Sequence, residues 1–190
     1  MIAKRGENSV KLLMGLVLTL MLSSIALAEE VTQQIGPYNV SFDMKTNNEY
    51  QVQTSNPVEM PTFTAYPMRV ITDNNTFSDI VIYENKNPTD STPAIEKTIT
   101  GLTLMLSGFN VTKSEDKIID GKEGFVLFSE PLPENKAAPS QFVQASYWTD
   151  GKKCECGPVS VGNTKVLIGS SYPNDVTNGI LNSLKVIKNQ

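Results

Sequence analysis

The stretch at residues 164–187, TKVLIGSSYPNDVTNGILNSLKVI, constrains the fold more than any other part of the chain. Residues 165–169 form a short apolar and β-branched run, which is typical of a strand that lies centrally in its sheet. Tyr172-Pro173 then ends the extended segment, because proline restricts its own φ and the conformation of the residue before it. The stretch therefore predicts a buried strand, a turn and a closing helix.

The closing helix is expected from about residue 175 to residue 187. Asn174 or Asp175 can act as its N-cap by accepting a hydrogen bond from the first backbone N–H groups. Lys185 and Lys188 suit the negative end of the helix dipole. An apolar stripe with a period of 3.6 residues is expected to pack on the sheet that contains residues 165–169; it consists of Val176, Ile180, Leu181, Leu184 and Ile187.

The first 28 residues have the three parts of a secretory signal peptide. Basic residues precede an apolar run at 12–22, and A-L-A at 26–28 fits a cleavage site. We expect cleavage after Ala28, one domain over residues 29–190, and a secreted or extracytoplasmic location at the cell envelope. The alternative is an uncleaved anchor, but the apolar stretch at 12–28 is short for a spanning helix. After cleavage, no direct membrane insertion is expected.

Loss of residues 1–28 would change the formal net charge from −4 to −6. An acidic surface with no basic cluster argues against nucleic acid or an anionic membrane as partner. Export would also make three sequons candidate glycosylation sites if the producing cell glycosylates its exported proteins. These sequons begin at Asn39, Asn74 and Asn110.

The first half of the remaining chain carries mostly strand signals. Residues 29–34 read as a flexible leader, and residues 38–44 alternate apolar and polar side chains as in a half-buried strand. Residues 50–54 are expected to pair with 38–44 as a hairpin. Further strands are expected at 63–72 and 79–84, followed by a loop at 85–90.

A first helix is predicted over residues 92–108. Thr92 is a suitable N-cap, Pro93 suits the first helical position, and Gly108 can supply the left-handed stop. Its apolar stripe is expected to pack on the sheet, as the helix has poor intrinsic propensity and must be held by packing. This stripe consists of Ile95, Ile99, Leu102 and Leu106.

Strand signals return after the first helix. Residues 110–119 and 123–130 are separated by Asp120-Gly121, a strong hairpin signal. An exposed loop is expected at 131–139, a strand at 141–149, and a second hairpin turn at Asp150-Gly151. The order of elements predicts the α+β class, with a mostly antiparallel sheet and two packed helices.

This pattern resembles the PsbP-like superfamily, which includes the DcrB-like exported bacterial proteins. The resemblance is carried by the helix at 92–108, the strands at 121–128 and around Tyr147, and the closing segment KVLIGSSYPNDVTNGILNSLKVI. It implies a PsbP-like α-β sandwich that acts as a binding or accessory module. Histidines that bind metal in some photosynthetic members have no counterpart here.

The chain contains no histidine. The usual general base, the Ser/His and Cys/His nucleophile pairs and the commonest metal ligand are therefore missing. Carboxylate pairs at Glu115 with Asp116 and Asp43 with Glu49 are more simply read as solvated surface. We assign no catalytic residue, no cofactor and no metal ligand.

Cys154-Glu155-Cys156 is the local feature with the most chemical interest. On a strand, both thiols point to the same face. They could form a strained disulfide or an inert reduced pair, act as a labile redox pair, bond another chain, or give two soft ligands to a metal.

Aromatic side chains at Tyr66, Tyr83, Tyr147, Trp148 and Tyr172 could line a groove, but such residues are more often core or half-buried sheet positions. If one sheet face is uncovered, Tyr147 and Trp148 with the loop at 131–139 would be the candidate partner surface. The sequence thus favours an exported, non-enzymatic binding or accessory domain that acts through an unknown protein or envelope component. The alternative is a thiol redox or metal-handling protein that uses Cys154 and Cys156.

Overall fold

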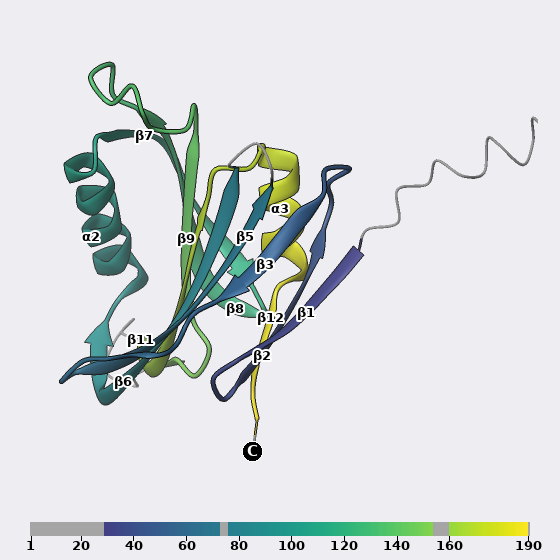
Figure 1. Cartoon of the computed structure of the whole chain (residues 1–190). Helices are drawn as coiled ribbons and strands as arrows, with labels where there is room; N and C mark the ends of the chain where they lie inside the picture. Colours follow the sequence, from purple (N-terminus) through teal and green to yellow (C-terminus); the bar gives the residue numbers. More distant parts are fainter. Residues whose placement is uncertain (1–28, 73–75, 154–159, 190) are drawn as a thin grey trace, which may run out of the picture.

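The computed structural model describes residues 29–72, 76–153 and 160–189. Two helices and mostly antiparallel strands confirm the predicted α+β class. The described strands form a large sheet and a small sheet, and the two helices lie on opposite sides of the large one (Figure 1).

The large sheet contains nine strands that pair antiparallel throughout. Its order is β3 (Tyr50–Thr54), β5 (Phe63–Thr72), β6 (Phe77–Ser91), β11 (Ser160–Ser170), β9 (Phe142–Trp148), β8 (Lys122–Pro131) and β7 (Phe109–Ile119). Two short strands lie off this path: β4 (Val58–Glu59) pairs with β5, and β10 (Lys152–Lys153) pairs with β11.

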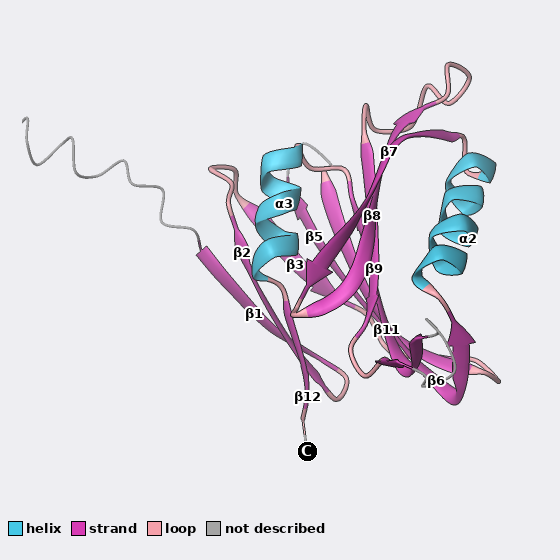
Figure 2. Cartoon of the chain, turned by 180° about the vertical axis from the view of Figure 1, so that it is seen from behind, coloured by secondary structure: helices cyan, strands magenta, loops and turns pink. Residues whose placement is uncertain are grey.

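The small sheet covers one face of the large sheet. It contains β1 (Glu29–Ile35), β2 (Tyr38–Met44) and β12 (Lys185–Lys188), and α3 (Asn174–Ser183) packs beside it. Seen from behind, these elements lie on one side of the large sheet and α2 (Pro93–Leu106) lies on the other (Figure 2). The main core lies between the two sheets; its largest fully buried side chains include Tyr38, Phe42, Met44, Met68, Ile80, Ile82 and Ile168.

Three strand predictions were wrong in their pairing or extent. Residues 29–34 belong to β1 and pair with β2, since Val31 and Ile35 are buried in the main core. The strand at 50–54 pairs with β5 instead of with residues 38–44. The expected loop at 85–90 is part of the long strand β6, which continues to Ser91. Each correction depends on a partner that is distant in the sequence, which local patterns do not reveal.

The closing helix docks as predicted but ends earlier. Val176, Ile180, Leu181 and Leu184 join the same core cluster as the β11 residues, which confirms the packing face. Neither Asn174 nor Asp175 is the N-cap, because Pro173 holds that position and its carbonyl accepts the Thr177 N–H at 2.9 Å. The chain becomes strand β12 after Leu184, so Ile187 is exposed instead of buried.

The two expected hairpin turns behave differently. Asp120 and Gly121 both have positive φ, at 51° and 71°, and connect β7 to β8 as predicted. Asp150-Gly151 does not join paired strands, because β9 pairs with β11 and β10 also pairs with β11. The Asp150 carboxylate instead accepts the backbone N–H groups of Asn163 and Thr164, at 3.0 and 2.9 Å.

No helix among the described residues is long and apolar enough to cross a membrane.

Gly101 offers a simple test of how α2 sits on the sheet. A Cβ added there would meet the Leu127 Cδ1 atom at 4.0 Å, which is an ordinary contact. We expect Gly101→Ala to raise the free energy of unfolding by about 1 kcal/mol, since alanine is the better helix former. Urea denaturation would measure the change. In the control Gly124→Ala, the new Cβ would lie 2.6 Å from the Ser146 carbonyl oxygen, so we expect destabilisation. A destabilised Gly101→Ala protein would contradict this packing.

Candidate binding surface

Helix α2 turns its charged residues toward the sheet. Its charged side chains are Glu96 and Lys97. The Glu96 Oε2 atom lies 3.0 Å from the Lys165 Nζ atom on β11, and its Oε1 atom accepts the Ser91 hydroxyl at 2.8 Å. Lys97 pairs with Asp116 on β7 at 2.5 Å. Ion pairs therefore lie on the inner side of this helix, where a surface helix usually presents apolar residues.

A small apolar cluster accompanies these ion pairs on the inner side of α2. Thr100 and Leu104 are its buried residues. Leu104 packs on Phe125 and Leu127 of β8 in a cluster separate from the main core. The prediction that Ile95, Ile99, Leu102 and Leu106 pack on the sheet was wrong, because all four are exposed.

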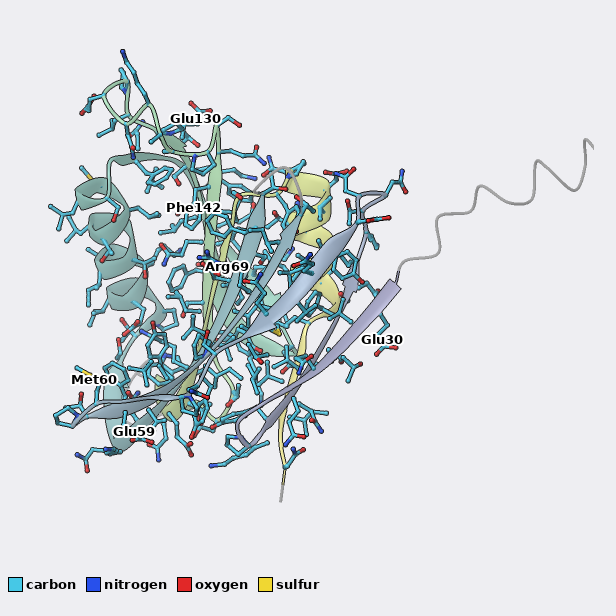
Figure 3. The ribbon with its side chains drawn as sticks, in the orientation of Figure 1. Glu30, Glu59, Met60, Arg69, Glu130 and Phe142 are labelled. Atoms are coloured by element: carbon cyan, nitrogen blue, oxygen red, sulfur yellow. The ribbon has the colours of Figure 1, made fainter. Side chains whose placement is uncertain are left out.

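We call these four residues together with Met105 the outer helix face. Their exposed fractions run from 52% for Ile95 to 91% for Leu106. These fractions correspond to an apolar area of roughly 600 Å², the upper end of the largest apolar patch on a typical monomer, which is often functional. Side chains project from α2 away from the sheet, as Figure 3 shows. The outer helix face is thus the strongest candidate for a contact surface in the described part of the chain.

Both ends of α2 are fixed by specific hydrogen bonds. The Thr92 hydroxyl accepts the Ile95 N–H at 3.1 Å, which confirms the predicted N-cap. Gly108 has φ 81° and confirms the predicted left-handed stop. The Asn135 side-chain amide donates to the Ser107 carbonyl at 3.2 Å. The loop at 131–139 therefore caps the helix C-terminus, and the outer helix face stands on a well-anchored element.

A second feature lies where α2 leaves the same sheet face uncovered. Arg69 on β5 and Asp79 on β6 are paired by two hydrogen bonds of 2.6 and 2.7 Å. They line a groove of about 310 Å³, and Arg69 lies in the middle part of the sheet (Figure 3). The other lining residues are Gln53, Ser55, Pro67, Met68 and Val81.

The charges of this groove are already satisfied within the protein. The hydrogen bonds that Arg69 donates to the Asp79 carboxylate raise the pKa of Arg69 above its ordinary value, so the guanidinium stays charged. The guanidinium carbon lies 4.6 Å from the centre of the Phe77 ring. Asp79 already neutralises the guanidinium charge, so the groove attracts an anionic ligand less than an unpaired arginine would and is less suited to binding than the outer helix face.

The predicted aromatic partner surface does not fit the observed burial. Tyr147 is 1% exposed and belongs to the main core, and Trp148 is 8% exposed. The Lys165 ammonium lies 5.8 Å from the centre of the Trp148 ring, on the side that faces α2. Since neither ring is exposed to solvent, these two residues do not form the candidate contact surface, which lies on α2 instead. The alternative interpretation of the aromatics as core or half-buried sheet positions is confirmed: Tyr147, Trp148 and Tyr172 are buried, and Tyr66 and Tyr83 are half-buried on strands.

The remaining predicted site residues that the structure describes, Asn39 and Asn110, do not belong to the outer helix face. Asn39 and Asn110 are both exposed, on β2 and β7, and the Asn39 side-chain amide donates to Asn189 at 2.8 Å. Asn74, Cys154 and Cys156 lie outside the described residues. Within the described ranges, no three Asp or Glu side chains gather as a metal site would require.

Comparison of the chain with protein-family models, with curated proteins and with solved structures finds no match. The function is therefore argued from the surface itself. Sequence reasoning found every residue of the outer helix face except Met105, but assigned its stripe to the core. A signal was present in Lys97, which lies opposite the apolar stripe on a helical wheel, and in Glu96, which lies at its flank.

Proposed function

We propose that this protein is an exported, non-enzymatic binding domain that docks a protein partner on the outer helix face. The proposed site of action is the cell envelope or the outside of the cell. The observation that carries the proposal is the inverted orientation of α2. Five apolar side chains point to solvent while both charged side chains of the helix are engaged with the sheet.

The five apolar side chains of the outer helix face are exposed, so they contribute little to the stability of the folded chain. Burial of this surface against a partner would be favourable by about 25 cal/mol for each Å² of apolar area removed from water. Polar residues at these positions would keep the helix and its ion pairs intact. A contiguous apolar stripe on a firmly capped helix is the arrangement used by helices that bind another helix or a groove.

The α+β architecture and the resemblance to PsbP-like accessory proteins agree with a binding role. We therefore also propose that the chain is related to the PsbP-like superfamily. The competing hypothesis of a thiol redox or metal-handling protein rests on Cys154 and Cys156. Both cysteines lie outside the described residues, so no described contact bears on this hypothesis. The groove at Arg69 supports binding less well, because its charges are paired internally.

Site-specific photo-crosslinking in the producing cell tests the proposal. A photoreactive phenylalanine analogue replaces Leu102 on the outer helix face, and the matched control carries it at Val58, which is similarly exposed on β4. We expect a discrete protein adduct from position 102 and none from position 58. The adduct should disappear when Ile99 is also changed to Glu, because a charge at the contact opposes burial. Equal crosslinking from both positions, or none from either, would contradict the proposal.

A further inference from the structure

We propose that the partner of the outer helix face is a second copy of this chain, held as a two-fold symmetric pair of antiparallel α2 helices. This inference rests on the proposed docking role of the same face and names its occupant. Two-fold symmetric homodimers are the commonest oligomers, and their interface is formed by one patch that is complementary to itself.

The spacing of the apolar stripe is self-complementary. Ile95, Ile99, Leu102 and Leu106 follow one another at intervals of four, three and four residues. This series reads the same in both directions, so a two-fold axis between residues 100 and 101 would bring Ile99 against Leu102 of the second copy. The same axis would bring Ile95 against Leu106 of the second copy. Antiparallel pairing also sets opposite ends of the two helix dipoles side by side.

Charge favours a second copy over a membrane surface. The chain is acidic overall, with 20 Asp and Glu residues against 16 Lys and Arg residues, so two copies repel each other through their net charge. The outer helix face avoids this repulsion because Glu96 and Lys97 are turned to the sheet. A helix that lies on an anionic lipid surface usually carries Lys or Arg beside its apolar face and aromatic residues within it. The exposed residues of α2 include neither kind.

The available area fits a small homodimer. Two outer helix faces would together bury roughly 1,200 Å², which is the lower end of stable specific interfaces. The helix has 14 residues and is therefore about 21 Å long, enough for the four contact layers of the stripe. The proposed dimer is thus a modest, reversible one, with a dissociation constant that can be measured by sedimentation.

Sedimentation equilibrium of the purified protein, as the cell processes it, tests the proposal. We expect a monomer–dimer equilibrium for the wild type. Leu102→Glu and Ile99→Lys should each raise the dissociation constant about 30-fold or more, as central apolar contacts do. The matched control is Ile187→Glu, an equally exposed apolar residue on β12, which should leave the equilibrium unchanged. Circular dichroism would verify that each variant is folded.

Mixing the two variants distinguishes the orientation of the helices. In an antiparallel pair, the carboxylate introduced at position 102 of one chain would face the ammonium introduced at position 99 of the other. The second contact would keep the original Ile99 and Leu102. The mixture of Leu102→Glu with Ile99→Lys should therefore form a heterodimer although each variant alone is monomeric. A mixture that stays monomeric would overturn the antiparallel arrangement.

The outcomes separate this inference from the proposed function. A wild-type protein that is monomeric at all concentrations, or a Leu102→Glu protein that still dimerises, overturns the self-association through α2. If the wild type is monomeric but position 102 crosslinks to a different protein in the cell, the second-copy inference fails and the docking role stands. If neither dimer nor adduct forms, both fail.

Discussion

Replacing Asp120 with alanine should lower the free energy of unfolding by about 3 kcal/mol. The Asp120 carboxylate lies in the turn between β7 and β8, and its contacts connect this turn to strand β12. Its Oδ2 atom accepts the Val186 N–H at 3.1 Å and the Tyr147 hydroxyl at 3.4 Å. Its Oδ1 atom lies 3.2 Å from the Lys185 ammonium. Alanine would remove an acceptor shared by a strand N–H and a buried hydroxyl, and such groups are costly to leave unpaired.

The conservative variant Asp120→Asn isolates the contribution of the negative charge, because it keeps an acceptor oxygen and suits the same backbone conformation. Asp120 has a positive φ of 51°, a conformation that asparagine tolerates and alanine does not. The asparagine carbonyl oxygen can still accept a hydrogen bond, whereas the attraction to Lys185 is lost. We expect Asp120→Asn to cost about 1 kcal/mol in urea denaturation at neutral pH. Equal losses for both variants would show that the retained acceptor and backbone tolerance contribute nothing.

Alkaline pH should destabilise the protein strongly. Burial raises the pKa of Tyr172 to about 12, and burial also raises the pKa values of Tyr38, Tyr66, Tyr83 and Tyr147. The unfolded chain loses its tyrosine protons near pH 10, whereas the folded protein keeps them. Stability is therefore fully present below pH 10 and is lost as pH rises through the folded-state pKa values. Tyr172 alone should account for about 3 kcal/mol of this loss above pH 12.

Tyr172→Phe tests the contribution of that one hydroxyl. Tyr172 is buried, and its hydroxyl has no hydrogen-bond partner among the described residues. The variant should change stability at pH 7 by less than about 1 kcal/mol, because no strong hydrogen bond is lost. Between pH 10 and 12 it should lose less stability than the wild type. Urea midpoints measured along a pH series, with tyrosinate absorbance recorded in parallel, would decide the matter. Identical pH profiles for the two proteins would contradict the burial argument.

The sequence predicted where α2 begins and ends, because its stop and start signals are local. The hydroxyl of Thr92 and the left-handed Gly108 act within a few residues of themselves. The sequence did not predict which side of α2 faces the sheet. That choice depends on Lys165 on β11 and Asp116 on β7, which meet Glu96 and Lys97 only after the sheet has formed. The candidate surface was missed for the same reason.

The end of the chain shows a similar limit. Residues 184–187 continue the apolar period of α3 and are equally compatible with a strand, since valine and isoleucine favour extended backbone. The outcome is decided by β2, whose edge pairs with β12 from Lys185 to Lys188. The prediction of a buried strand followed by a helix on the sheet succeeded because β11 and α3 carry their own signals in adjacent residues.

The positions of the first and last described strands have a practical consequence. β1 and β12 form the two edges of the small sheet, on the side of the large sheet opposite α2 (Figure 1). A sensor chip, bead or fluorophore attached near residue 189 would therefore present the outer helix face toward the solution. Immobilisation through this end gives oriented display of the proposed contact without engineering α2 itself.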